Sequence, residues 1–320
     1  AEYLGGLMGL THELQKYAVA RATVQDVKSV VMAKRVIDAI YGKLMEFDFR
    51  NGPLRKKYDS VKYQLRRLED LLYELSLVGL EEKGLAEESQ DEEETPLPSV
   101  LDAAELEAIR GRMEAYDATR EHVIKATRDV QKLSKNAIYS LHRGDRAKAE
   151  KQLAEAFTLT KALEPTILQV PTLRYGSYAS AMEEYAEARL FQAWLAHRRL
   201  PALEELGVVE PLEYLGGLMD LTGELGREAV ARATRRDAAG VAECRDTDLK
   251  ILELLLQLPL GKMSKKMDMV NSGVRKLDNV LYELSLVKAG KGTRGPPSSI
   301  TEQPSKGEED GNRMEEEDDI

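Results

Sequence analysis

Four acidic residues lie in two pairs, and the spacing of each pair places it on one face of a helix. Glu184 and Glu187, in MEEYAEA, are three residues apart, and Asp220 and Glu224, in DLTGE, are four apart. Their neighbours are largely apolar, so burying unpaired carboxylates there would be costly. A shared Mg²⁺ or Mn²⁺ ion would relieve that cost, because these ions take carboxylate oxygens and water. The alternative is a pair of ordinary solvated helix faces, neutralised by nearby arginines.

The sequence offers few residues for other kinds of metal site or for covalent catalysis. Cys244 is the only cysteine, which excludes a disulfide scaffold and an all-cysteine metal site. The four histidines are scattered along the sequence, which argues against a histidine-rich zinc site and a metal-free His–His ribonuclease mechanism. The acidic pairs are therefore the leading candidates for catalysis.

The elements that carry these residues are predicted to be helices throughout. Strand-like alternation is absent, and glycine and proline fall between the helical runs. Pro53 and Pro211 suit the first turns of helices that follow them. The run from Leu101 to Arg143 contains no proline and predicts one helix roughly 65 Å long, at ~1.5 Å per residue. The predicted fold class is all-α, an elongated helical bundle.

The acidic net charge is concentrated in two segments without large apolar stretches. The chain has 320 residues and a net charge of −10. Segments 81–94 and 302–319 hold seventeen acidic and three basic residues, a net −14, so the remainder carries about +4. The mildly basic remainder leaves nucleic-acid binding open. Residues 81–99 are predicted to be an acidic linker and residues 289–320 a disordered tail. No apolar run approaches a membrane span.

The chain contains a long internal repeat. EYLGGLM occurs at 2–8 and 213–219, AVARAT at 18–23 and 229–234, and LYELSLV at 72–78 and 281–287. A period near 190 residues is too long for a solenoid and indicates a tandem domain duplication. We expect one and a half copies: a first copy at 1–80 with only its later half, and a complete copy at 100–288.

Several segments, taken in order, resemble the translin family. EYLGGLMDLTGELGREAV, MEEYAEA and TRDVQKLSKNAIYSLHR are similar to its factor-X branch, and the sequence from Asn51 to Gly79 is similar to the last helices of translin itself. The resemblance implies a helical unit that assembles into hollow, barrel-like octamers. It also implies binding of single-stranded RNA and DNA, and a Mg²⁺-dependent endoribonuclease in the factor-X subunit, acting in RNA silencing and tRNA-fragment processing.

The family's catalytic acids lie in segments that match the two acidic pairs here. The resemblance thus implies both a metal-binding and a catalytic role for four residues: Glu184, Glu187, Asp220 and Glu224. The first copy has Gly9 where the second has Asp220, and only Glu13 keeps an acid. We therefore expect the first copy to lack a metal site.

Basic and aromatic residues are candidates for contacting nucleic acid. The basic ones on the long helix recur every three to four residues: Lys125, Arg128, Lys132 and Lys135. Arg174, Tyr175 and Tyr178 resemble a basic-aromatic stretch that the family uses for the same purpose. The alternatives are a solvated face paired with acids such as Asp129 for the stripe, and core packing for the two tyrosines. The basic residues at 55–67 are interpreted as a solvated face.

These patterns predict a single-stranded nucleic-acid-binding, Mg²⁺-dependent endoribonuclease subunit of a translin-type complex. Its expected partners are single-stranded RNA, DNA as well, and translin-type subunits or further copies of itself. We expect it in the cytoplasm, the nucleus or both. Two alternatives remain, a non-catalytic translin-like nucleic-acid-binding protein and a scaffold subunit that only builds the octamer.

Overall fold

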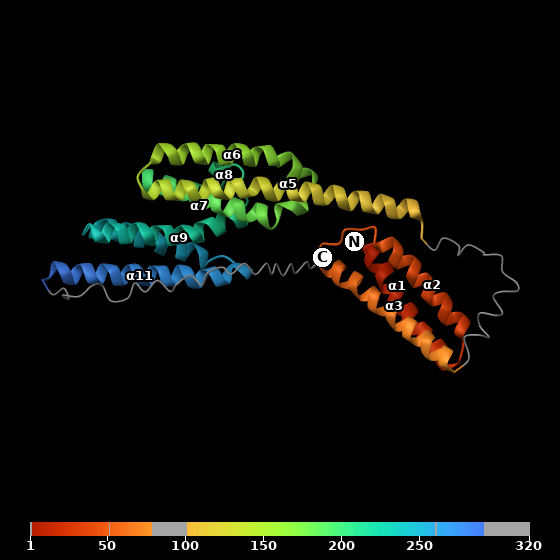
Figure 1. Ribbon diagram of the computed structural model, residues 1–320. Helices are drawn as coiled ribbons and strands as arrows, with labels where there is room; N and C mark the ends of the chain where they lie inside the picture. The colour runs from red at the N-terminus through yellow and green to blue at the C-terminus, as the bar shows by residue number, and fades with distance from the viewer. Residues whose placement is uncertain (1, 51, 79–100, 260, 291–320) are drawn as a thin grey trace. The chain divides into compact units, whose positions relative to one another are not determined.

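The computed structural model describes residues 2–50, 52–78, 101–259 and 261–290. Within these ranges the chain forms α-helices and two short 3-10 helices, and no strand (Figure 1). This confirms the all-α prediction. The predicted acidic linker lies outside the described residues, and so does the predicted tail beyond Gly290.

Two compact units divide the chain, unit 1 up to Ala115 and unit 2 from Tyr116 onward. The helices of unit 1 are α1 (Glu2–Thr23), α2 (Val27–Leu44) and α3 (Pro53–Leu77), followed by the start of α5. Those of unit 2 are the rest of α5 (Ala103–His142), α6 (Arg146–Gln169), α7 (Ser177–His197), α8 (Leu203–Leu206), α9 (Pro211–Thr234), α10 (Ala238–Leu255) and α11 (Ser264–Lys288). The 3-10 helices are η1 (Pro171–Arg174) and η2 (Gly261–Met263).

The three helices of unit 1 pack pairwise around one apolar core. α1 contacts α2 and α3, and α2 contacts α3, so the three lie side by side (Figure 1). Leu4, Ile37 and Leu68 are completely buried between them. Leu106 and Ile109, from the start of α5, join the same core. The beginning of the long helix therefore belongs to the core of unit 1.

Unit 2 is built around α7, whose middle is buried on nearly every side. Tyr178, Phe191 and Trp194 are among the largest fully buried side chains. A helix that is apolar all round belongs in the interior of a bundle. α9 packs against α7, and α10 and α11 pack against α9. The acidic residues of MEEYAEA are thus carried by the central helix of unit 2.

Local signals at the helix ends agree with most of the predicted boundaries. α3 begins at Pro53 and α9 at Pro211, as predicted, because a first-turn proline has no amide hydrogen bond to lose. The predicted long helix is confirmed as α5, with 40 residues. Gly144, at φ +77°, makes the turn into α6, and the Asp145 carboxylate caps that helix.

One boundary expectation is wrong. Pro165 lies inside α6 and not between helices. Pro165 removes one backbone hydrogen bond, and the packing of buried Leu163 and Ile167 on either side of it compensates for this loss.

Candidate active site

Two adjacent glycines allow α7 and α9 to cross at close range. A Cβ atom on Gly217 would lie 2.7 Å from the Cβ of Ala186 and 2.7 Å from the backbone nitrogen of Glu187. A Cβ on Gly216 would lie 2.6 Å from the Glu183 carboxyl carbon. Such distances are shorter than ordinary van der Waals contacts, so only glycine fits without displacement. The glycine pair of the repeated motif thus brings the acidic segments of the two helices together.

Glu187 lies at the centre of this crossing, and its side chain is only 8% exposed. Burial, followed by the negative charges of Glu224, Glu184 and Asp220, raises the pKa of Glu187 to about 8, against the opposing effect of Lys266. The carboxylates of α7 and α9 are therefore close enough to interact electrostatically. The two acidic pairs predicted from the sequence are brought into one cluster.

Two lysines from different helices form ion pairs with the cluster. Lys135 on α5 lies 3.2 Å from a Glu184 oxygen. Lys266 on α11 bridges Glu183 and Asp220, at 2.8 Å and 3.0 Å. Burial lowers the pKa of Lys266, but its hydrogen bonds to these two carboxylates outweigh burial and raise it. The site therefore offers both carboxylates and ammonium groups within one small region.

Glu224 is held by two further groups. The Nε2 atom of His142, at the end of α5, hydrogen-bonds to a Glu224 oxygen, and Arg227 lies 3.2 Å from the same oxygen. The imidazole of His142 packs against the ring of Phe191, with 4.8 Å between ring centroids. Both side chains of the His142–Glu224 pair are largely buried. This arrangement fixes the orientation of the Glu224 carboxylate.

The chemistry of the donor set fits a hard divalent cation, although the side chains do not converge on one point. Among the described residues, no group of three or more His, Cys, Asp or Glu side chains is positioned to hold a metal ion. Carboxylates of the cluster turn instead towards Lys135, Lys266 and His142. An ion at this position would relieve the mutual repulsion of the carboxylates in the same way as these cations do.

Sequence reasoning missed three residues of this cluster: Glu183, Lys266 and His142. Glu183 directly precedes Glu184, but it lies one position off the predicted face. His142 is the next-to-last residue of TRDVQKLSKNAIYSLHR, and nothing local relates it to Glu224, 82 residues away. Lys266 is similarly remote from Asp220 in sequence. No local spacing signal could have identified either residue.

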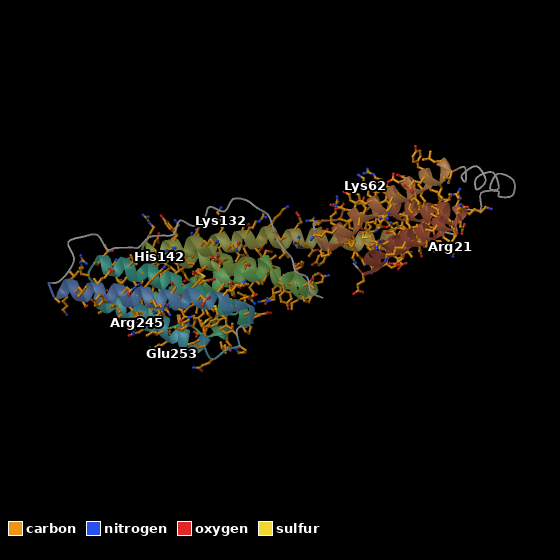
Figure 2. All side chains as sticks on the ribbon, turned by 90° about the horizontal axis from the view of Figure 1, so that it is seen from below. Arg21, Lys62, Lys132, His142, Arg245 and Glu253 are labelled. Atoms are coloured by element: carbon orange, nitrogen blue, oxygen red, sulfur yellow. The ribbon has the colours of Figure 1, made fainter. Side chains whose placement is uncertain are left out.

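The predicted basic stripe lies on the exposed side of α5. Lys125, Arg128, Lys132 and Lys135 are all exposed, and Lys132 is labelled in Figure 2. Lys125 lies 3.8 Å from Glu121, one helical turn away. Lys135 contacts Glu184, so the stripe ends at the acidic cluster. A nucleic-acid strand whose phosphates bind along the stripe would thus reach the carboxylates.

Two of the other residues predicted to contact nucleic acid, Arg174 and Tyr178, make contacts within unit 2. Tyr178 is 2% exposed and belongs to the core of unit 2, so it cannot stack on a base. Arg174 is held by ion pairs with Glu210 and Glu213, each at 2.8 Å, and its guanidinium lies over the Tyr178 ring. The burial of Tyr178 favours the core-packing alternative for this residue, and contact of Arg174 with nucleic acid stays a prediction. Only Tyr175, 76% exposed, keeps a ring free for stacking.

The corresponding position in unit 1 carries no acidic cluster in the described residues. Gly9, which aligns with Asp220, is exposed. Glu13, which aligns with Glu224, is exposed and pairs with Lys16, one turn away. The carboxylates that α7 supplies in unit 2 have no counterpart here. Unit 1 therefore lacks the constellation seen in unit 2.

Comparison with known proteins places the chain in a family. The translin family profile matches residues 1–79 and 118–288, which include both copies of the repeat. The chain belongs to the translin family. Translin of Gallus gallus is 32% identical to this chain over 79 residues, which are 25% of this chain and 34% of that protein. The chain thus spans about a third of the length of the translins it matches.

The longer alignment is with a different relative. Translin-associated protein X of Mus musculus is 24% identical over 231 residues, covering 57% of this chain and 77% of that protein. Among solved structures, "Crystal structure of AfC3PO" matches with a TM-score of 0.53 and 25% identity, over 58% of this chain and 99% of that chain. "Structure of AfC3PO - duplex RNA complex" matches with the same TM-score, 24% identity, and 58% and 98% coverage. This translin family member therefore shares its helical fold with these proteins.

Proposed function

We propose that this translin family chain is a single-stranded nucleic-acid-binding subunit whose unit 2 carries a Mg²⁺-dependent endoribonuclease site. The observation that carries the proposal is the cluster of Glu184, Glu187, Asp220 and Glu224 around the α7–α9 crossing. The duplex RNA bound by one structural relative supports RNA as the ligand class.

The four carboxylates would hold Mg²⁺ or Mn²⁺, with Lys135 and Lys266 turning away from them. The bound ion would polarise a water molecule and neutralise charge on the scissile phosphate. Lys125, Arg128 and Lys132 bind the phosphates of the strand, and exposed Tyr175 is available for base stacking. His142 holds the Glu224 carboxylate in place.

We further propose that the subunit works within a hollow assembly of translin-type subunits or of its own copies, in the cytoplasm, the nucleus or both. RNA silencing and tRNA-fragment processing are the proposed settings. No helix among the described residues combines the length and the apolar character needed to cross a membrane.

One observation favours a second candidate, a non-catalytic binding protein. The lysine and histidine partners already neutralise carboxylates of the cluster. If they remained in place, unit 2 would bind nucleic acid along α5 without cleaving it.

Matched substitutions in the two copies test the catalytic proposal. Labelled single-stranded RNA is incubated with the full chain in Mg²⁺ and, separately, in EDTA. We expect metal-dependent cleavage that Asp220→Ala and Glu224→Gln each reduce by about 100-fold or more, equal to roughly 2.7 kcal/mol of transition-state stabilisation. Glu13→Gln, the matched change in the first copy, should leave the rate unchanged. Metal-independent cleavage, or equal rates in all variants, would disprove the site; binding without cleavage would support the second candidate.

A second experiment tests the basic stripe. Removing Arg128 and Lys132 together should weaken binding of single-stranded RNA and lower the slope of log K against log salt by about 1.4, at ~0.7 per phosphate contact. The control removes the same charge from unit 1, with Lys62→Ala and Arg66→Ala. Fluorescence anisotropy in EDTA, at several salt concentrations, separates binding from cleavage. Equal losses in both double variants would show that only net charge matters.

A further inference from the structure

Two contacts made by α5 bracket the acidic cluster. Lys135 lies 3.2 Å from a Glu184 oxygen, and His142 hydrogen-bonds to Glu224. Because Lys135 and His142 are two helical turns apart, they lie on one side of α5, separated along its axis by roughly 10 Å at ~1.5 Å per residue. The stretch of α5 between them therefore runs beside the carboxylates of α7 and α9.

Tyr139 lies within this stretch and is 61% exposed. Its neighbours in sequence, Ile138 and Ser140, are buried, so the backbone at this point is anchored in unit 2. A single exposed tyrosine is ordinary on a protein surface. The position of Tyr139 beside the acidic cluster, and the contacts of its ring, distinguish it from other exposed tyrosines of the chain.

The guanidinium of Arg143, which directly follows α5, holds the Tyr139 side chain. Its Nη1 atom donates a hydrogen bond of 3.0 Å to the tyrosine hydroxyl, and its Cζ atom lies 5.5 Å from the ring centroid. The hydroxyl is thus engaged, and a ligand would meet the face of the ring. A side chain that is already held in place loses little conformational freedom when a ligand binds to it.

Tyr139 and Arg143 continue the line of the basic stripe beyond Lys135. From Arg128 and Lys132 onward, these residues recur every three or four positions, a spacing that places helical side chains on one side. All of them are exposed. Cationic side chains therefore precede and follow one accessible ring. Proteins bind single-stranded nucleic acid with this combination, in which cations contact phosphates and aromatic rings stack on bases.

We propose that Tyr139, held by Arg143, is a stacking platform for one unpaired base of an RNA strand bound beside the acidic cluster. This role rests on the proposed binding of RNA along α5 and adds to it the feature that is recognised, an unpaired base. Every base has a π face, so the platform accepts any sequence. A base inside a duplex already stacks on its neighbours and does not reach the ring. The platform therefore favours single strands over duplexes.

Three labelled probes of equal length test this role: a single-stranded RNA, the same strand paired with its complement, and a strand whose sugars carry no bases. Fluorescence anisotropy in EDTA gives the dissociation constant of the full chain for each probe without metal-dependent cleavage. Tyr139→Ala should weaken binding of the single strand by about fivefold or more, the effect of losing one stacked base. Binding of the other two probes should not change. The slope of log K against log salt should also stay the same, because no charge is removed.

Two further variants serve as controls. Tyr139→Phe keeps the ring and should bind the single strand within about twofold of the unchanged chain, since stacking uses the ring face. Tyr282→Ala removes a tyrosine of α11 that is 64% exposed, and it should bind all three probes as the unchanged chain does. Circular dichroism confirms that the variants are folded.

The outcomes separate this role from the proposed function. Equal losses for all three probes would overturn the platform, because they would indicate that Tyr139 only supports the structure. Single-strand binding that is the same with and without Tyr139 would remove the stacking role and leave RNA binding along α5 intact. Absence of RNA binding by the unchanged chain would refute the stacking role and the proposed function together.

Discussion

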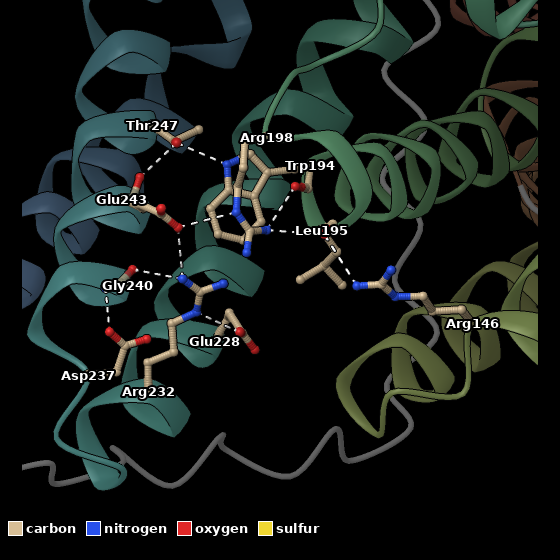
Figure 3. A network of polar contacts seen from close by, with 10 residues as sticks. All are labelled: Arg146, Trp194, Leu195, Arg198, Glu228, Arg232, Asp237, Gly240, Glu243 and Thr247. Carbon is tan, nitrogen blue, oxygen red and sulfur yellow. Dashed lines mark hydrogen bonds and ion pairs between the residues drawn. The ribbon is translucent and has the colours of Figure 1, made fainter.

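The segment AVARAT occurs once in α1 and once in α9, and its arginine has opposite surroundings in the two places. Arg232 in α9 is buried, hydrogen-bonds to Glu228, Glu243 and the Gly240 carbonyl, and lies over the Trp194 ring (Figure 3). Arg21 in α1 is exposed, and its guanidinium lies over the Tyr17 ring. Trp194 belongs to α7. The same six residues thus form a solvated turn or a buried polar network, depending on whether a helix lies over them.

The difference extends along the whole of the repeated helix. Gly217 and Leu221 are enclosed by α7, whereas Gly6 and Leu10 face outward. One turn after Gly217, Asp220 of unit 2 joins an acidic cluster, whereas the matching position of unit 1 is Gly9. Where the covering helix is present, the repeat supplies part of a candidate active site. Where no helix of the described residues covers it, the same face of the repeat is exposed.

The largest expected effect on stability comes from the buried arginine. Arg232→Met should destabilise unit 2 by about 3 kcal/mol, because it leaves the Glu228 carboxylate, only 15% exposed, without its cation. The matched Arg21→Met should change the free energy of unfolding by less than about 0.5 kcal/mol. Urea unfolding measures both: circular dichroism follows the whole chain, and the fluorescence of Trp194, the only tryptophan, reports on unit 2. Equal effects would show that burial does not distinguish the two sites.

The next prediction concerns a glycine-to-alanine change that should destabilise unit 2 but stabilise unit 1. Gly217→Ala should cost about 2 kcal/mol, because the added methyl group meets the α7 backbone. Gly6→Ala should stabilise unit 1 by about 0.5–1 kcal/mol, because alanine favours the helix and nothing lies in its way. Thermal unfolding of both variants tests this prediction. Destabilisation by Gly6→Ala would mean that another group packs against this side of α1.

A smaller effect concerns a buried acid that unit 1 replaces with an apolar residue. Asp248 is completely buried, neither of its oxygens has a hydrogen-bond partner within the described structure, and Ile37 is its counterpart in α2. Burial raises the pKa of Asp248 to about 8, from an ordinary 3.8. The folded chain therefore retains a proton that the unfolded chain releases, and this group lowers stability as pH rises from about 4 to about 8.

Asp248→Ile removes this dependence. Near pH 4 the variant should be more stable than the unchanged chain by about 1–2 kcal/mol, the cost of burying an unpaired polar group. The difference should grow as pH rises towards 8, because the unfolded chain then releases a proton that the folded chain retains. Glu187, whose pKa is also raised, affects both proteins equally and cancels in the difference. Urea unfolding at pH 5, 6.5 and 8 tests the trend, and a gap that does not vary with pH would contradict the raised pKa.

The sequence by itself determined the helical class, the repeat and the pairing of acids on helix faces. These features depend on neighbours within a few residues: Pro53 and Pro211 begin helices, and the spacings of Glu184–Glu187 and Asp220–Glu224 follow from 3.6 residues per turn. Local periodicity is therefore enough to place the acidic residues on α7 and α9.

Only the tertiary structure decided which helix faces are covered. The contacts of Lys266 with Asp220 and of His142 with Glu224 join residues 46 and 82 positions apart, and the burial of Tyr178 depends on the neighbouring helices. Identical segments such as AVARAT show the physical reason most directly. A helix face is buried or exposed according to what packs against it, and that packing partner is specified far away in the sequence or by another molecule.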